Sequence, residues 1–168
     1  MKKEQETIFL NALEENQEKL LRICSIYSKD HEDTKDLFQE VLVHIWRSMA
    51  SFKGNSSRST WMFRVALNVC LRFKSKRTKN QNRFIRLDSM TIANVGSEER
   101  SGGENEKLIS LRKCVKKLNE GDKAIVALYL EGLAYREISS ILGLSENNIA
   151  VKVKRIKSKL LNCINEIS

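Results

Sequence analysis

The chain has 168 residues and a formal net charge of +9, from 30 lysines and arginines against 21 acidic residues. This length suits one medium-sized domain or two small ones, and a hydrophobic fraction of 41% is enough for packed cores. The basic surplus favours a polyanionic partner, with nucleic acid as the first candidate. The alternative is a soluble protein that carries its lysines for solubility.

Signals for secretion, membrane insertion and catalysis are missing from the sequence. The N-terminal stretch MKKEQETIFLNALEENQEKLL has no uninterrupted apolar core, and no later segment is apolar over the length of a bilayer, so we expect a cytoplasmic protein. The sequence has no glycine-rich phosphate loop, nucleophile elbow or pair of catalytic carboxylates. We therefore expect a protein that is not an enzyme and needs no cofactor.

The cysteines give no sign of a metal site. Cys24, Cys70, Cys114 and Cys163 lie far apart in the sequence, without CxxC spacing and without a histidine at ligand spacing. In a reducing compartment they are predicted to be small buried hydrophobic side chains. A zinc site assembled from distant segments is the weaker alternative, so we expect no bound metal.

The absence of proline and the recurrence of apolar residues at steps of three and four predict an all-α chain. The first helix is predicted over about residues 3–29. A second helix follows, capped by Asp33 or Thr34, with a core stripe that ends at Met49 and Phe52. After the loop KGNSSRS, a third helix is predicted to begin at Ser59 or Thr60.

The middle of the chain is predicted to be a linker between two small helical domains. The run from Arg72 to Leu87 holds seven basic residues and no acid, and SMTIANVGSEERSGGENE follows, rich in serine and glycine and locally acidic. The predicted boundaries are residues 1–80 for the first domain, 81–106 for a flexible linker and 107–168 for the second domain. The second domain is predicted to hold four helices, one of them capped by Asp122.

The segment GLAYREISSILGLSENNIAVKVKRIKSKL, residues 132–160, predicts a helix-turn-helix. Gly143 suits the left-handed residue that ends the first helix, Leu144 fills the corner, and Ser145 caps the second helix. The second helix is predicted to bury a stripe at steps of four and three, formed by Ile149, Val153, Ile156 and Leu160. An ordinary αα-hairpin with a basic surface is the alternative.

That burial predicts which side chains of the second helix remain free to meet DNA. Residues near its start lie where a recognition helix meets base edges. Later lysines suit phosphate contacts, which position a protein without reading sequence. The base-edge candidates are Glu146, Asn147, Asn148, Lys152 and Arg155, and the phosphate candidates are Lys154, Lys157 and Lys159.

Together, the two halves resemble a bacterial extracytoplasmic-function (ECF) sigma factor. DHEDTKDLFQEVLVHIWRSMASFKGNSSRSTWMFRVALNVCLRFKSK is similar to region two of that family, and LRKCVKKLNEGDKAIVALYLEGLAYREISSILGLSENNIAVKVKRIKSKL to region four. The resemblance implies a two-domain initiation factor that binds core RNA polymerase and promoter DNA and is silenced by an anti-sigma factor. The alternatives are a helix-turn-helix regulator that acts without polymerase, and an adaptor whose basic faces bind acidic proteins.

The resemblance also implies roles for polar residues of the first domain. Side chains of the second helix would contact core polymerase: Asp36, Gln39, Glu40, Val43 and Trp46. The loop and third helix would bind and open the minus-ten element through Asn55, Ser56, Ser57, Arg58, Trp61, Arg64, Asn68, Arg72, Lys74, Lys76 and Arg77. The stripe on the second helix is alternatively a solvated face, and Trp46 and Trp61 are alternatively packing residues.

Several positions depart from the family pattern, three of them in the helix-turn-helix. Ala134 stands where a serine or threonine cap is usual, so the first helix of the helix-turn-helix is predicted to begin less firmly. Asn148 replaces a common threonine on the recognition helix, and Ala150 replaces a frequent lysine. The sequence of the minus-thirty-five element therefore cannot be predicted from the family.

Overall fold

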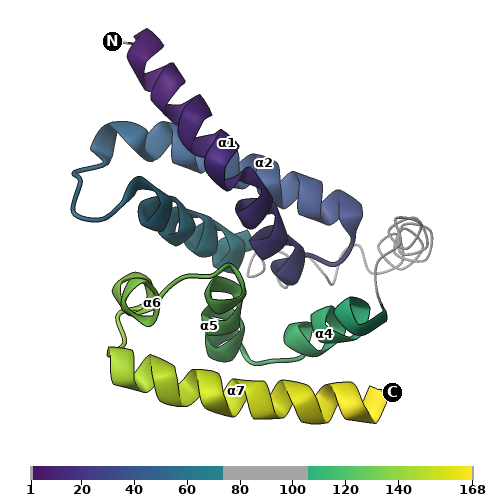
Figure 1. Ribbon diagram of the computed structural model, residues 1–168. Helices are drawn as coiled ribbons and strands as arrows, with labels where there is room; N and C mark the ends of the chain where they lie inside the picture. The colour runs from purple at the N-terminus through teal and green to yellow at the C-terminus, as the bar shows by residue number, and fades with distance from the viewer. Residues whose placement is uncertain (1, 74–105, 168) are drawn as a thin grey trace. The chain divides into compact units, whose positions relative to one another are not determined.

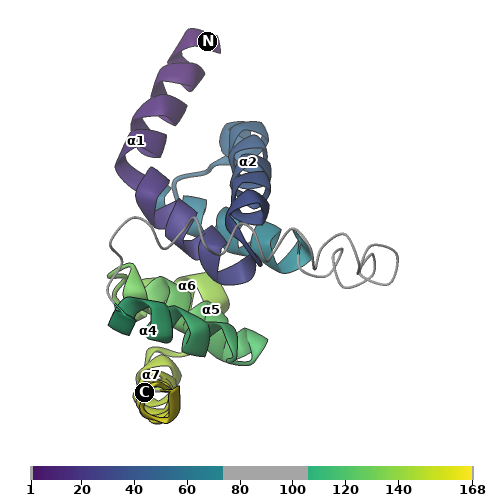
Figure 2. The ribbon, with the colours of Figure 1, turned by 90° about the vertical axis from the view of Figure 1, so that its right-hand side faces the viewer.

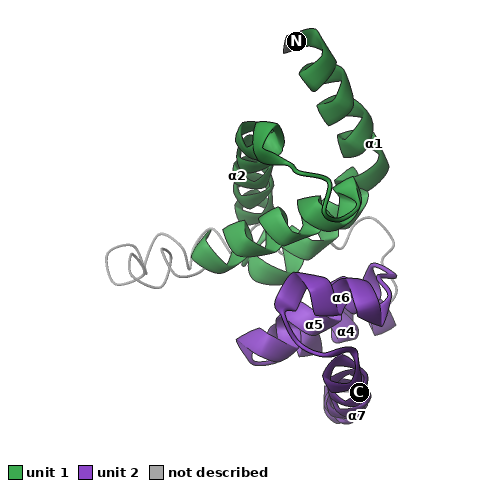
Figure 3. Cartoon of the chain, turned by 90° about the vertical axis from the view of Figure 1, so that its left-hand side faces the viewer, with its two compact units in different colours: residues 1–99 green, residues 100–168 purple. Residues whose placement is uncertain are grey.

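The computed structural model describes residues 2–73 and 106–167, and within these residues it contains helices and short connections but no strand, which confirms the all-α prediction (Figure 1). The chain divides into two compact units, Met1–Glu99 and Arg100–Ser168, called here the N-terminal and C-terminal units (Figure 3). No helix among the described residues is long and apolar enough to cross a membrane. The predicted linker lies outside the described residues except for Glu106, so the domain boundaries at residues 80 and 107 stay predictions.

The described residues of the N-terminal unit form three helices and a short 3-10 turn. Helix α1 (Lys2–Tyr27) packs against α2 (His31–Ser48), and the turn η1 (Met49–Ser51) contacts both. A further helix begins at residue 58 and continues to residue 73, the last residue described before the gap. Apolar side chains at helical spacing fill the space between these elements, and each contributes roughly 1.5–3 kcal/mol by burial. The fully buried ones include Leu20, Ile23, Leu37, Ile45 and Met62.

The predicted cap of α2 is wrong by a few residues, and the third helix begins at residue 58, just before its predicted start. Asp30 caps α2, because its Oδ1 accepts a hydrogen bond from the backbone N–H of Asp33 at 2.9 Å. Thr34 is instead turned inward, where it bonds to Ser28 and is buried. The following helix begins directly after Ser57, whose Oγ accepts from the N–H of Thr60 at 3.1 Å.

One buried polar side chain joins α1 to the helix of residues 58–73. The Nδ2 of Asn16 donates to the carbonyl of Ala12 at 2.9 Å and to the Oγ of Ser59 at 3.2 Å. Asn16 is only 3% exposed. It therefore fixes the start of the third helix, and with it the preceding loop, against α1.

Replacing Asn16 with alanine is expected to lower the free energy of unfolding of the N-terminal unit by about 1–3 kcal/mol, because Ser59 loses a partner and a cavity opens. Chemical denaturation of the full chain, followed by a probe in this unit, measures the loss. Asn11→Ala, on the exposed side of the same helix, is the matched control and is expected to change little. Equal losses in the two variants would contradict a positioning role for Asn16.

The C-terminal unit consists of α4 (Glu106–Lys116), α5 (Glu120–Leu130), α6 (Tyr135–Leu142) and α7 (Glu146–Ile167). Helix α7 runs along one side of the other three and contacts each of them (Figures 1 and 2). Its buried residues are Ile149, Val153, Ile156 and Leu160, which confirms the predicted stripe. Asn119 caps α5 by accepting from the N–H of Asp122 at 2.8 Å, so the predicted cap at Asp122 is wrong.

The prediction for the cysteines is correct for one pair and wrong for the other. Cys24 and Cys70 are buried free thiols, and a hydrogen bond with Cys24, together with burial, raises the pKa of Cys70. Cys114 and Cys163 form a disulfide between α4 and α7, with their Cα atoms 5.9 Å apart. Sequence spacing could not reveal this pair, because the packing of α4 on α7 brings together residues that are 49 positions apart.

Candidate nucleic-acid interface

The turn between α6 and α7 is fixed by three local hydrogen bonds. Gly143 has a left-handed φ of 75°, and its N–H donates to the carbonyl of Ser139 at 2.8 Å. The Ser139 hydroxyl donates to the carbonyl of Leu144, which closes the corner. The Oγ of Ser145 then accepts from the N–H of Asn148 at 3.1 Å. The predicted roles of Gly143 and Ser145 are therefore confirmed.

Helix α6 begins without a side-chain cap at Ala134, as expected from its sequence. The N–H of Ala134 instead donates to the carboxylate of Glu137 at 3.2 Å. One free amide group of the first turn is thus satisfied from within the helix. The prediction of a less firm start missed this compensation, although an acid three residues after the cap position is a readable signal.

The first turns of α7 place most of the predicted DNA-contacting residues on its free surface. Glu146, Asn147, Asn148, Lys154 and Arg155 are exposed, and Lys152 is half-buried at the edge of this set. Residues three and four positions apart lie on the same side of a helix. The asparagines, Lys154 and Arg155 therefore form one continuous surface opposite the buried stripe, called here the outer face of α7.

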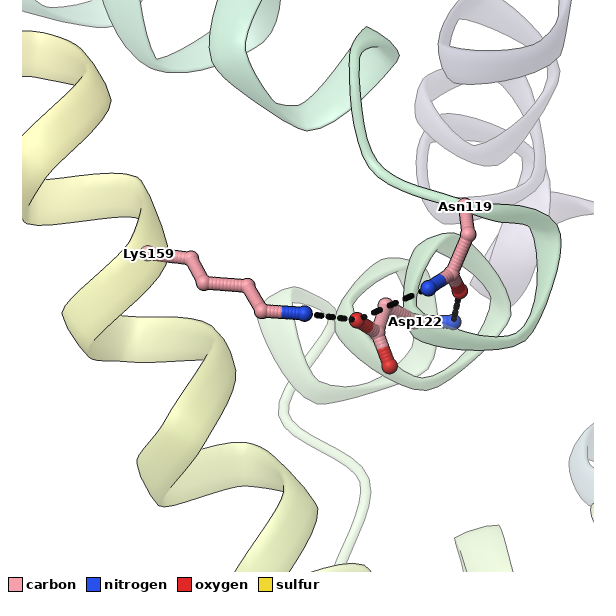
Figure 4. Close-up of polar contacts among 3 residues, drawn as sticks. All are labelled: Asn119, Asp122 and Lys159. Carbon is pink, nitrogen blue, oxygen red and sulfur yellow. Dashed lines mark hydrogen bonds and ion pairs between the residues drawn. The ribbon is translucent and has the colours of Figure 1, made fainter.

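The two other predicted phosphate contacts bind within the C-terminal unit itself. The Nζ of Lys159 lies 3.0 Å from Oδ2 of Asp122, which is in turn held by Asn119 (Figure 4). The Nζ of Lys157 lies 4.9 Å from the centre of the Tyr129 ring, and a hydrogen bond with Tyr129 raises the pKa of Lys157. Both lysines therefore join α7 to α5.

The N-terminal unit carries a hollow next to the predicted minus-ten loop. The rings of Phe52 and Trp61 lie 5.4 Å apart, and the guanidinium of Arg58 lies 5.3 Å from the centre of the Phe52 ring. Trp61 is half-buried, so its ring both packs on Phe52 and borders the hollow. The hollow, called here the aromatic hollow, has a volume of about 310 Å³ and is lined by Glu4, Gln5, Ile8, Met49, Ala50, Phe52, Arg58 and Trp61.

Sequence reasoning placed Phe52 only in the core stripe and missed its contact with Arg58. The loop turns at Gly54, whose φ is 76°, and leaves Asn55 and Arg58 exposed. The hydroxyl of Ser57 is bonded to Thr60 at 2.8 Å, so this residue has a structural role at the start of the helix.

The third helix continues the predicted minus-ten surface away from the loop. Trp61 and Arg64 are half-buried, and Asn68 and Arg72 are exposed at steps of three and four along the same side. Lys74, Lys76 and Arg77 lie outside the described residues.

The predicted polymerase-contacting stripe lies along α2. Asp36, Gln39, Glu40 and Val43 are exposed, and Val43 has 45% of its surface accessible. Trp46 is half-buried, with its ring centre 5.1 Å from that of Phe9 of α1 in an edge-to-face arrangement. The stripe thus ends at an aromatic pair that joins the two helices.

Comparisons with known proteins match the two units to two separate families. Residues 12–80 match the family model described as Sigma-70 region 2, and residues 108–160 match the model described as Sigma-70, region 4. The chain is 27% identical over 131 residues to RNA polymerase sigma factor YlaC of Bacillus subtilis, covering 77% of this chain and 76% of that protein. It is 28% identical over 141 residues to the ECF RNA polymerase sigma-E factor of Haemophilus influenzae, covering 79% and 75% of the two chains.

Solved structures agree in fold. CnrH, in complex with the cytosolic domain of CnrY, aligns with a TM-score of 0.68 and 19% identity over 97% of this chain and 91% of that one. The sigma factor RpoE of Bartonella quintana, in complex with the anti-sigma factor NepR, aligns with a TM-score of 0.64 and 20% identity over 90% and 95% of the two chains.

Proposed function

The chain belongs to the ECF sigma factors of bacterial RNA polymerase, and we propose that it binds core polymerase in the cytoplasm and directs it to promoters that carry two spaced elements. The observation that carries the proposal is that one chain joins a unit matching region 2 with a unit matching region 4. A regulator that acts without polymerase would lack the first of these. The chain performs no catalysis itself, since the polymerase forms the bonds.

Co-elution with bacterial core polymerase, followed by run-off transcription from a promoter library, tests this function. Co-elution together with new transcripts that share two spaced upstream elements is the expected result. If the chain bound duplex DNA but ignored the polymerase, the initiation role would be abandoned in favour of a helix-turn-helix regulator.

The α2 stripe is proposed to be the main contact with core polymerase. Val43 supports this role because a large exposed aliphatic side chain between Glu40 and the Trp46 ring provides an apolar centre with a polar rim, as protein interfaces do. We expect Val43→Asp to weaken core binding about ten-fold, since central interface residues commonly carry this much affinity.

Leu21→Asp is the matched control for Val43→Asp, because Leu21 of α1 is 42% exposed and receives the same charge outside the stripe. Titration of labelled core polymerase with each full-length variant measures the two affinities. Equal weakening by the two substitutions would count against the α2 stripe.

The aromatic hollow is proposed to help open the minus-ten element. A base leaves the duplex only where new stacking and hydrogen bonds replace those it loses. Phe52 and Trp61 provide aromatic rings, and Arg58 and Gln5, which also line the hollow, provide hydrogen-bond donors. The exposed Asn68 and Arg72 continue this surface along the helix and suit contacts with the separated strand and its phosphates.

The outer face of α7 is proposed to read the minus-thirty-five element in the major groove. Asparagine pairs with adenine and arginine with guanine through two hydrogen bonds each, which suits Asn147, Asn148 and Arg155 to base edges. Lys154 is suited to a phosphate, because it is exposed on the same face.

We expect Lys154→Ala to weaken promoter binding on all sequences alike and to lower the salt slope of binding by about 1, since one phosphate contact is lost. Lys159→Ala is the matched control, because the Lys159 ammonium is already paired with Asp122 at 3.0 Å. Holoenzyme affinities measured over a range of potassium chloride concentrations give both slopes. A larger slope change for Lys159→Ala than for Lys154→Ala would reverse the assignment.

The C-terminal unit is also proposed to contact the flap of the polymerase. An almost wholly apolar groove of about 270 Å³ lies among α4, α5 and α7 and suits an apolar helix or loop of the partner. Its lining includes Leu111, Val126, Leu130, Leu161 and Ile164.

An anti-sigma factor is proposed as a further partner of this chain. The solved complex of RpoE with the anti-sigma factor NepR supports a similar inhibitory partner.

A further inference from the structure

The outer face of α7 contains one large aliphatic side chain that is exposed among polar and charged residues. Val151 has 49% of its surface accessible, and it is the only large hydrophobic residue exposed in the first three turns of α7. The two other exposed large hydrophobic residues of this helix, Leu161 and Ile167, lie near its C-terminal end.

Val151 lies in the middle of the polar residues assigned to DNA. It follows Asn147 and Asn148 by one helical turn and precedes Lys154 and Arg155 by another, and all four are exposed. Side chains three and four positions apart stand next to one another on a helix. Whatever surface meets the two asparagines and the two basic residues must therefore also meet Val151.

We propose that Val151 reads the C5-methyl group of a thymine in the minus-thirty-five element. The proposal rests on the proposed function, and it adds an apolar contact to the polar ones already assigned. In the major groove, thymine is the only base that presents a methyl group, and apolar side chains recognise it by contact. Lys154 and Arg155 supply the positive charge that brings a polyanion against this face.

The chemistry of valine suits this role and excludes a contact with phosphate. Its side chain has no donor or acceptor, so it cannot bind an oxygen of the backbone. Its branched Cβ leaves it one strongly preferred rotamer in a helix, which places its two methyl groups in a fixed position. Burial of one methyl group against such a side chain raises the binding affinity about four-fold.

The experiment uses full-length protein with core polymerase. The preferred minus-thirty-five element is first selected from a promoter library with a randomised upstream region. Each thymine of that element, on either strand, is then replaced by deoxyuridine, which removes only the C5-methyl group. Affinities are measured for the wild-type protein, for Val151→Ala and for Ile167→Ala, the control at an exposed residue near the end of the same helix.

One thymine is expected whose demethylation weakens wild-type binding about four-fold, the effect of one buried methyl group. The same change is expected to have no further effect on Val151→Ala, because the two changes remove one interaction. Ile167→Ala is expected to respond as the wild type does.

Polymerase-dependent binding in which no thymine methyl matters, or in which Val151→Ala responds as the wild type does, overturns the role of Val151 alone. An absence of polymerase-dependent promoter binding overturns the proposed function itself.

Discussion

Replacing Trp61 with alanine is expected to slow the formation of open promoter complexes by roughly 5- to 150-fold, the effect of about 1–3 kcal/mol for one base stacked on an aromatic ring. The ring of Trp61 is half-buried, packs on Phe52 at 5.4 Å and borders the aromatic hollow. Its removal therefore takes away one wall of the site proposed for an unpaired base. Permanganate reactivity of promoter thymines over time measures the rate of opening.

A loss of folding would also reduce opening, so two comparisons separate the causes. Trp61→Phe retains an aromatic face and is expected to recover most of the rate. A second promoter is mismatched over the minus-ten element, so part of the cost of melting is already removed. On this promoter, the loss that Trp61→Ala causes relative to the wild-type protein is expected to be smaller than on the fully paired promoter.

Trp46→Ala is the matched control for this experiment. Trp46 is the other tryptophan of the chain, is also half-buried and packs on Phe9 at 5.1 Å, and neither of these two residues lines the aromatic hollow. With core polymerase saturated by the variant, Trp46→Ala is expected to open promoters at nearly the wild-type rate. If the two tryptophan variants were equally slow under saturation, Trp61 would be a packing residue only.

The helices and their buried faces could be predicted from the sequence because burial follows the helical period directly. Ile149, Val153 and Ile156 recur at steps that only a helix brings to one side, and the structure buries them as predicted. Gly143 was equally readable, since few other residues adopt its left-handed φ of 75° at low cost.

The helix caps were missed because several short polar residues stand in a row before each helix. Asp30 and Asp33 are chemically equivalent candidates, and Ser57, Ser59 and Thr60 are nearly so. The choice depends on which hydroxyl the tertiary packing turns inward. Thr34 and Thr60 are buried, so the residues before them remain free to cap.

The structure gives internal partners to two of the residues predicted to contact DNA, which the sequence could not show for a related reason. Lys157 and Lys159 were assigned to phosphates from charge alone, and their partners Tyr129 and Asp122 lie on a different helix, far away in the sequence. Val151 was passed over because an isolated exposed valine is ordinary on a protein surface. Only its position among the exposed residues of α7 makes it informative.

Reduction of the disulfide between Cys114 and Cys163 is expected to lower the free energy of unfolding of the C-terminal unit by about 4 kcal/mol, on the chain-entropy account of a loop of this length. The bond joins residues 49 positions apart and closes a loop that contains α5, α6 and most of α7. Without the bond, this loop is no longer closed in the unfolded chain, so the unfolded state gains conformational entropy. The apolar packing of α4 on α7 in the folded state remains. The unit is therefore expected to stay folded but to open more often.

Hydrogen exchange of the full chain, read by mass spectrometry with and without a dithiol reductant, measures this opening, and thiol trapping counts the thiols released. Peptides from α4 and α7 are expected to exchange faster after reduction. Peptides from α1 and α2 are the internal control, because Cys24 and Cys70 are already free thiols. A double variant, Cys114→Ser with Cys163→Ser, is expected to exchange at the reduced rate whether or not reductant is present.

Within α7 the effect of reduction is expected to be graded. Cys163 lies near the C-terminal end of the helix, whereas the outer face occupies its first turns, where Ile149 and Val153 are buried. Between them, Lys159 pairs with Asp122 at 3.0 Å, and this contact is expected to persist after the disulfide is cut. Protection should therefore fall most in the last turns and least around Asn147. Complete release of both thiols with unchanged exchange throughout α7 would show that packing alone holds α4 and α7 together.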